Sequence, residues 1–271
     1  MSRVYKIDYK PYTGRRLSIS HRTWILYIEY LKHILFKFGG KFFKFALYSS
    51  LAIPAISAIS QLFFTYIRYN FTQKVEISFE NVASSASFPL YFMVAIAASF
   101  LMSTLMTSDY PIFMKYRNME RGMWLSLYLV AFTLLFVPMM LAFLTLLLGT
   151  TAMFPLQVHF SQEFFNFLEN VIKWTIVVLI SDNIIITFSL LLKKSTFGSL
   201  ASATYPLILG IVISIISEIS AIPYQQLQTL NIAEMLFTPG DANMSYLLIN
   251  LMLYTIILLM VFLYRRKYTW R

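Results

Sequence analysis

Long apolar blocks, separated by short polar segments, fill the chain from residue 45 to residue 264. Five blocks contain no charged residue: 45–67, 81–108, 122–162, 195–217 and 242–264. A further block, 171–192, is interrupted only by Lys173 and Asp182. About 20 helical residues cross the hydrocarbon core of a bilayer, so each block is long enough for a transmembrane helix. Because the blocks are continuously apolar and do not alternate, helices are expected and a β-barrel is not.

The pattern predicts an all-α, polytopic membrane protein with six transmembrane helices. The predicted spans are about 45–67, 88–107, 123–148, 170–192, 197–219 and 244–264. We divide the chain into a cytoplasmic N-terminal segment with an amphipathic helix, 1–41, and a six-helix transmembrane domain, 42–271. Between the spans, the outer segment 220–243 is unusually apolar and contains a short helix-like piece at 230–237. Such a segment can re-enter the bilayer if protein covers its backbone.

An amphipathic helix is predicted ahead of the first span, over 20–38, and Gly39 and Gly40 are expected to end it. Its apolar face comprises Trp24, Ile25, Ile28, Leu31, Leu35 and Phe38. The opposite face carries Arg22, Glu29, His33 and Lys37. A helix with a basic polar side is suited to the membrane interface. The alternative, a helix packed on a soluble domain, is less favoured because no soluble domain is predicted.

Positive charge is confined to every second gap between the blocks. Of 22 Lys and Arg residues, ten precede residue 45, three lie in 109–121, two are Lys193 and Lys194, and four lie in 265–271. Only three lie elsewhere: Arg68 and Lys74 in the gap after the first block, and Lys173 at the start of the block 171–192. This positive-inside pattern predicts a multi-pass protein of the plasma membrane with both termini in the cytoplasm. The net charge of +10 is attributed to segments that face anionic headgroups, and no nucleic-acid partner is expected.

Composition narrows the chemistry that the chain could carry. It is 58% hydrophobic and 13% charged, too few charges for a soluble domain of this length, and it has no cysteine. Disulfides, thiolate metal sites and a cysteine nucleophile are therefore excluded. The first 40 residues lack an apolar core of the kind found in signal peptides, so no cleavable signal peptide is expected.

No motif supports catalysis or metal binding. The scattered glycines form no phosphate-binding loop. The three histidines, His21, His33 and His159, fall on both sides of the predicted membrane, too far apart for a metal site. We therefore predict no catalytic residue, no metal site and no cofactor on this chain. An enzyme is not excluded by these absences.

Asp182 is the most unusual single residue, because an ionisable group near the middle of a span is costly and usually faces a bundle interior or an aqueous path. One interpretation is a polar translocation path lined by Asp182 with Ser181 and Asn183 beside it. The other is a protonated or hydrogen-bonded aspartate that holds helices together. A second pair, Glu169 and Lys173, has the i,i+4 spacing of a solvated ion pair at the outer end of a helix.

The segment 108–122 is longer than a turn between spans requires and mixes charges with large apolar side chains. It has the size of a helix that could dock on a cytoplasmic protein, or of an interfacial helix that touches only lipid. Two possible glycosylation sites, Asn70 and Asn243, lie in sequons on predicted outer loops, as the topology requires.

Taken together, the layout resembles the membrane subunits of ABC transporters of the ABC-2, or type-2 exporter, class. The N-terminal Tyr-Lys-Pro-Tyr-Thr-Gly-Arg-Arg at 9–16 leads into a basic amphipathic helix, as in the openings of some prokaryotic permeases of that class. A helix-sized loop joins the second and third spans, an apolar outer segment precedes the last, and a Tyr-Arg-Arg-Lys tail follows it. Family loops between the second and third spans often read Pro-[Ile/Leu]-Ser-Arg, where this chain has Asn118-Met119-Glu120-Arg121.

The resemblance implies that 108–122 is the coupling helix that meets a separate ABC ATPase, which would carry the ATP and Mg. The residues it assigns to this coupling are Tyr110, Pro111, Phe113, Met114, Lys115, Tyr116, Arg117, Met119, Glu120 and Arg121, with Arg15 and Arg16 helping to hold the ATPase. It also implies an exporter that works with a second permease copy or a sister permease, with the substrate passing between the two. Small residues on the first and fifth spans would then lie near the pair interface.

Two other functions stay open at this level. The chain could be a structural or assembly subunit of a larger membrane complex, without a pathway of its own. An integral membrane enzyme that acts on lipid ranks last, because no cluster of polar residues gathers at one leaflet.

Overall fold

A computed structural model describes residues 19–37, 39–75, 77–107, 120–192, 195–220, 227, 230–239 and 242–268. Its elements are α1 (Ile19–Lys32), a π-helical turn η1 (His33–Lys37), α2 (Lys41–Thr72), α3 (Phe79–Thr107), α5 (Glu120–Met153), α6 (Phe160–Leu191), α7 (Ser195–Ser220), α9 (Ile232–Phe237) and α10 (Met244–Tyr268). Six of them, α2, α3, α5, α6, α7 and α10, are long and apolar enough to cross a membrane. The predicted all-α, multi-pass architecture is therefore confirmed.

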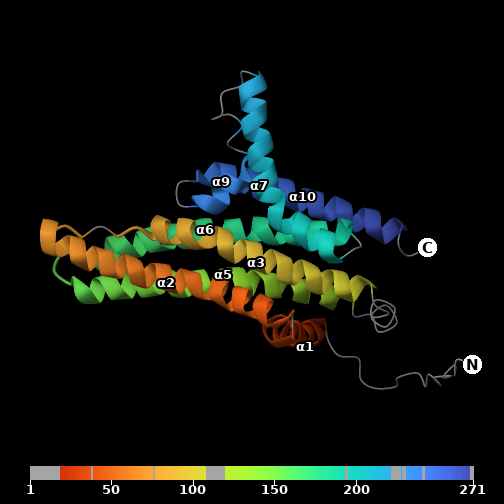
Figure 1. The fold of residues 1–271 in the computed structure, drawn as a ribbon, viewed down its shortest axis with the longest axis horizontal. Helices are drawn as coiled ribbons and strands as arrows, with labels where there is room; N and C mark the ends of the chain where they lie inside the picture. The colour runs from red at the N-terminus through yellow and green to blue at the C-terminus, as the bar shows by residue number, and fades with distance from the viewer. Residues whose placement is uncertain are drawn as a thin grey trace, which may run out of the picture.

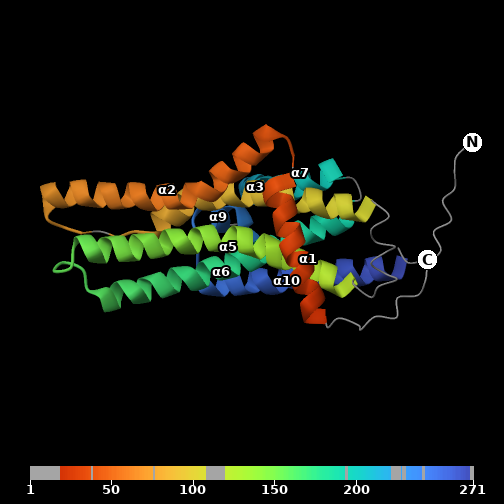
Figure 2. The same cartoon turned by 90° about the horizontal axis from the view of Figure 1, so that it is seen from below.

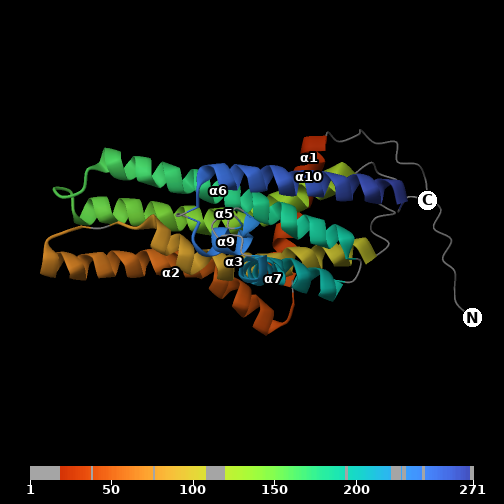
Figure 3. The ribbon, with the colours of Figure 1, turned by 90° about the horizontal axis from the view of Figure 1, so that it is seen from above.

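Helix α6 is the centre of the bundle, and α3, α5, α7 and α10 all pack against it. Over the 18 most apolar consecutive residues of each helix, 78% of the residues are buried in α6, compared with 22% in α2, 28% in α7 and 17% in α10. Figures 2 and 3 show the long helices side by side, with the C-terminal end of α10 toward the same end of the bundle as α1. The outward faces of α2, α7 and α10 are apolar, as a lipid-facing surface requires.

Several helices are longer than predicted, and α6 shows this most clearly. It begins at Phe160 and not near 170, so most of the predicted outer stretch 149–169 is helical. Helices α2, α5 and α6 have 32, 34 and 32 residues. At ~1.5 Å per residue they are about 50 Å long, more than the ~30 Å hydrocarbon core. At one end they project together beyond α3 and α10 (Figure 3).

Helix α1 lies across the bundle and packs on α5 (Figure 2). Its buried apolar side chains are Leu26 and Tyr30, followed by Ile34 of η1. The predicted apolar face is centred roughly a third of a turn away, and two of its members, Trp24 and Ile25, are 60% and 40% exposed. The helix therefore has two apolar sides, one docked on α5 and one facing outward. Sequence alone could not separate them, because both are apolar.

Helix α7 changes direction part-way along, and its second half leaves the side of the bundle (Figure 1). Pro206 lies inside α7, where it cannot donate a backbone hydrogen bond, which is a common cause of such bends. The short helix predicted at 230–237 is present as α9. Its Ile232, Met235 and Leu236 are buried, and it packs on α3 and α7. This packing explains why the outer segment is so apolar.

Helices α2 and α5 approach closely at Gly149, where an added Cβ would lie 2.5 Å from Leu62 Cδ1. Replacing Gly149 by valine is expected to destabilise the protein by about 1–3 kcal/mol, because the larger side chain must displace Leu62. The melting temperature of the purified protein in detergent measures this effect. Gly40 offers the control, because a Cβ added there would have no neighbour within 4 Å. An equal loss from Gly40→Val would contradict the explanation.

Candidate functional site

Three consecutive polar residues, Ser181, Asp182 and Asn183, lie in the middle of α6, and all three are buried. Successive residues of a helix are about 100° apart, so the three side chains face different neighbours. Ser181 Oγ donates to the carbonyl oxygen of Val177, at 2.8 Å. Asn183 Nδ2 donates to Thr255 Oγ1 of α10, at 3.0 Å. Two of the three residues therefore have partners, and one of them ties α6 to α10.

Asp182 differs from its two neighbours. Its side chain is 0% exposed, and within the described residues neither carboxylate oxygen has a hydrogen-bond partner. Tyr91 of α3 and Tyr128 of α5 lie close enough to interact with it electrostatically. A buried polar group without a hydrogen bond typically costs about 1–3 kcal/mol. Asp182 is therefore a group that the fold tolerates and does not use to hold helices together by hydrogen bonds.

Tyrosines from three helices form a buried polar network beside this centre. Tyr91 of α3 donates to the carbonyl oxygen of Ser202 in α7 at 2.5 Å, and Ser99 Oγ lies 2.7 Å from Ser202 Oγ. The hydroxyls of Tyr205 in α7 and Tyr254 in α10 are 2.7 Å apart. These bonds join α3, α7 and α10 around α6.

The sequence interpretation overlooked these tyrosines, although a signal was present. Tyr91, Tyr128, Tyr205 and Tyr254 all lie inside charge-free blocks. A tyrosine hydroxyl that packs inside a span usually requires a hydrogen-bond partner, so tyrosines at these positions indicate a partly polar interior. Which hydroxyls meet depends on helix packing, which the sequence does not give.

The predicted translocation residues Ser181, Asp182 and Asn183 thus lie in the interior of one chain. A path between two copies would be lined by the helices that are least buried within one copy, which are α2, α7 and α10. Helix α6 is instead enclosed by its neighbours. Their assignment to a path stays a prediction. The contact that Asn183 makes on another helix is with Thr255 of α10, the residue next to Tyr254.

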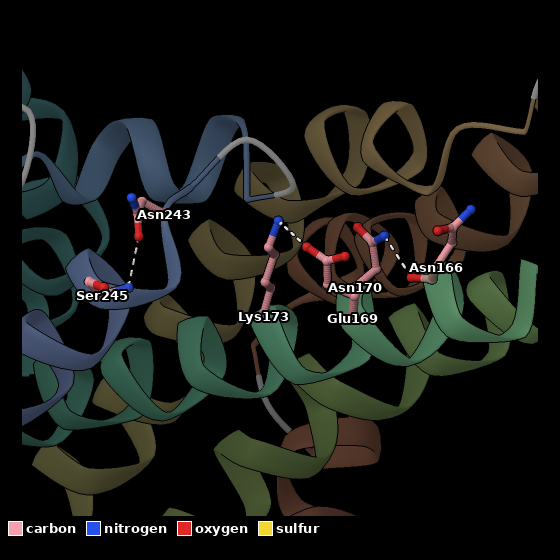
Figure 4. Close-up of polar contacts among 6 residues, drawn as sticks. All are labelled: Asn166, Glu169, Asn170, Lys173, Asn243 and Ser245. Carbon is pink, nitrogen blue, oxygen red and sulfur yellow. Dashed lines mark hydrogen bonds and ion pairs between the residues drawn. The ribbon is translucent and has the colours of Figure 1, made fainter. Parts of the chain in front are cut away.

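A second polar region occupies the first half of α6 (Figure 4). Lys173 Nζ lies 2.9 Å from Glu169 Oε1, so the predicted i,i+4 ion pair is present. The pair is less solvated than expected, because the Lys173 side chain is only 14% exposed while that of Glu169 is 60% exposed. Asn170 Nδ2 donates to the carbonyl oxygen of Asn166 at 2.9 Å.

The two sequons occupy different local structures. Asn70 lies in the last turn of α2, and not in a loop as predicted, because α2 continues to Thr72. Asn243 directly precedes α10, and its Oδ1 accepts a hydrogen bond from Ser245 N at 3.0 Å (Figure 4). Both asparagines are exposed. Glycosylated asparagines usually lie in surface loops, so the position of Asn243 fits a glycosylation site better than that of Asn70.

Most of the predicted ATPase-coupling residues lie outside the described part of the chain. These are Arg15, Arg16, Tyr110, Pro111, Phe113, Met114, Lys115, Tyr116, Arg117 and Met119. Glu120 and Arg121 are the first two residues of α5. The ends of α3 and α5 that flank this connection lie toward the end of the bundle at which α10 terminates (Figure 2).

Fold and site together define a multi-pass, α-helical membrane protein with a buried polar centre. Among the described residues, no group of three or more His, Asp or Glu side chains could hold a metal ion. Comparisons with protein-family models, with curated proteins and with solved structures find no match to this chain. Its function is therefore argued from architecture and from individual residues.

Proposed function

We propose that the chain is the membrane-spanning permease subunit of an ATP-driven transporter of the exporter type. A separate ABC ATPase docks on the segment 108–122, binds the ATP and Mg, and hydrolyses the ATP. The permease works with a second copy or with a sister permease, and both termini are cytoplasmic. The observation that carries this proposal is the long connection between α3 and α5, rich in charged and aromatic residues, which leads directly into a helix on which α1 packs.

The contacts around the start of α5 support a coupling role for this connection. Ser126 Oγ, two turns into α5, donates to the carbonyl oxygen of Thr23 in α1, at 2.8 Å. The ring of Trp124 packs edge-on against Phe262 of α10, with centroids 6.0 Å apart. A displacement of the connection by an ATPase would therefore act on α1, α5 and α10 together. Rigid helices in contact are suitable carriers of such a displacement.

Charge reversal in the connection tests the proposal. The triple variant Lys115→Glu, Arg117→Glu and Arg121→Glu is expected to lower the amount of ATPase that copurifies with the permease at least about tenfold, or about 1.4 kcal/mol. Like charges at an interface repel, and the partner's acidic groups would lose their counterions. Quantitative immunoblotting of the purified complex provides the measurement.

Lys74→Glu is a control for charge reversal elsewhere in the chain. Lys74 is exposed and lies just beyond the C-terminal end of α2, outside the connection. It is expected to leave the ATPase bound. If the wild-type chain purifies in mild detergent as a stable protein without any ATPase, the proposed class of transporter is wrong.

The second candidate function is a structural or assembly subunit without a transport pathway. The burial of Asp182 and its polar neighbours inside one chain favours it. This alternative predicts that Asp182→Asn changes stability and leaves transport by the whole complex unchanged.

A further inference from the structure

The chain turns sharply between η1 and α2, at Gly39 and Gly40. Gly39 has a φ of +64°, and an added Cβ there would lie 2.7 Å from the Cβ of Phe43. Glycine adopts this left-handed backbone conformation at no steric cost, because it has no Cβ. Lysines stand on both sides of these two glycines: Lys37 at the end of η1, and Lys41 and Lys44 in α2. We refer to these three residues as the lysine elbow.

One hydrogen bond shows how the two arms of the lysine elbow face each other. The hydroxyl of Tyr48 in α2 donates to the carbonyl oxygen of Leu35 in η1. Lys44 and Lys41 precede Tyr48 by four and seven residues, so they lie on the same face of α2. The face of α2 that carries them is therefore the face turned toward η1, which ends at Lys37.

The protein supplies no counterion for these lysines within the described residues. No Asp or Glu occurs between residues 30 and 75. The nearest preceding acid, Glu29, lies 3.7 Å from Lys32 in an ion pair of its own. Lys37 and Lys41 are exposed and Lys44 is half-buried. Three positive charges at one turn repel each other, so an external anion would stabilise the arrangement.

Aromatic side chains beside the lysines indicate where that anion comes from. Phe36, Phe42 and Phe45 are 64%, 76% and 71% exposed. A free anion in water gains nothing from such rings, whereas a lipid offers a charged headgroup next to an apolar chain. Basic and aromatic residues together are typical of segments at a membrane surface. Helix α1, which leads into the turn, lies across the bundle as an interfacial helix would (Figure 2).

We propose that the lysine elbow is a binding site for an anionic phospholipid. The ammonium groups of Lys37, Lys41 and Lys44 hold the phosphate, and Phe36, Phe42 and Phe45 contact the acyl chains. The site fixes the angle between α1 and the first span by occupying the turn between them. The proposal goes beyond the transport function and does not depend on it, since an assembly subunit would bind the lipid equally.

Native mass spectrometry of the full chain in detergent, titrated with phosphatidylglycerol or with phosphatidylcholine, tests this site. The variant Lys37→Gln, Lys41→Gln and Lys44→Gln is expected to lose about fivefold in phosphatidylglycerol affinity per lysine, from about 1 kcal/mol each. Phosphatidylcholine binding is expected to stay unchanged. The melting temperature of each variant, measured without lipid, checks that it is folded.

Two controls separate charge from other effects. Lys74→Gln removes one exposed positive charge elsewhere and is expected to leave lipid binding unchanged. Substituting arginine at all three positions keeps the charge and is expected to preserve binding, so that a loss in the folded glutamine variant is attributed to the missing charge. Equal phosphatidylglycerol affinity in the wild type and the glutamine variant would overturn the proposal.

The source of the anion is tested by competition and by the rings. An excess of inorganic phosphate is expected to displace little phosphatidylglycerol, and the double variant Phe42→Ser and Phe45→Ser is expected to weaken lipid binding several-fold. Complete displacement by inorganic phosphate, or full affinity without the two rings, would show a site for a soluble anion and overturn the lipid assignment.

Discussion

Replacing Trp174 by alanine is expected to destabilise the protein by about 3–5 kcal/mol, the range observed for removal of large buried aromatic side chains. Trp174 is 1% exposed and belongs to the most enclosed helix of the bundle. Its indole nitrogen has no hydrogen-bond partner within the described residues, so its contribution comes from packing. Packing is a principal source of helix association in membranes, where lipid is as apolar as the side chains. The loss is measured by heating the protein in detergent and monitoring the fraction that stays folded by size-exclusion chromatography.

Phe165→Ala provides the control on the same helix. Phe165 is 69% exposed, near the end of α6 that projects beyond α3 and α10. Surface substitutions usually change stability by less than about 0.5 kcal/mol, and a similarly small effect is expected here. If both variants lost the same stability, the central position of α6 in the bundle would be wrong.

Replacing Asp182 by leucine is expected to stabilise the protein by about 1–3 kcal/mol, the opposite of the usual effect of a core substitution. The two side chains have the same number of heavy atoms and the same branching, so the space is filled. The substitution removes two buried oxygens that have no hydrogen-bond partner within the described residues. Thermal unfolding of both proteins in the same detergent gives the difference.

The neighbouring substitution Asn183→Leu is the matched control, with the same change in shape and the opposite expected sign. It breaks the 3.0 Å hydrogen bond to Thr255 and is expected to cost about 0.6 kcal/mol, the average for such bonds between membrane helices. A loss of about 1 kcal/mol or more from Asp182→Leu would show that the carboxyl group makes a stabilising interaction.

The functional meaning of Asp182 is decided by Asp182→Asn in the assembled complex. A residue that reduces stability is commonly retained for function. Lost transport with unchanged stability would support the predicted translocation role. Changed stability with normal transport would favour the assembly-subunit alternative. The polar centre of α6 would then have a structural role and no role in transport.

The lengths of the helices illustrate how far sequence patterns reach. Apolar blocks locate the part of each helix that lies in lipid, because charge is costly there. They do not locate the helix ends outside the bilayer, where charged residues are compatible with a helix. This is why α6 begins about ten residues before its predicted span and includes the charged residues Glu163 and Glu169. The short helix α9 was predicted within an outer segment that is unusually apolar for a solvated loop.

Sequence alone determined the class of this protein: an all-α chain with six long apolar helices, whose basic residues gather in every second gap between the apolar blocks. Those features follow from the cost of placing charge and unpaired backbone groups in hydrocarbon, which acts on each segment separately. Only the tertiary structure decided that α6 is central, that Leu26 and Tyr30 dock α1 on α5, and that Asp182 is enclosed without a hydrogen-bond partner in the described part of the chain. These depend on which helix faces which. In a chain whose helices are apolar on nearly all sides, close packing selects the contacts, and no periodic pattern records them.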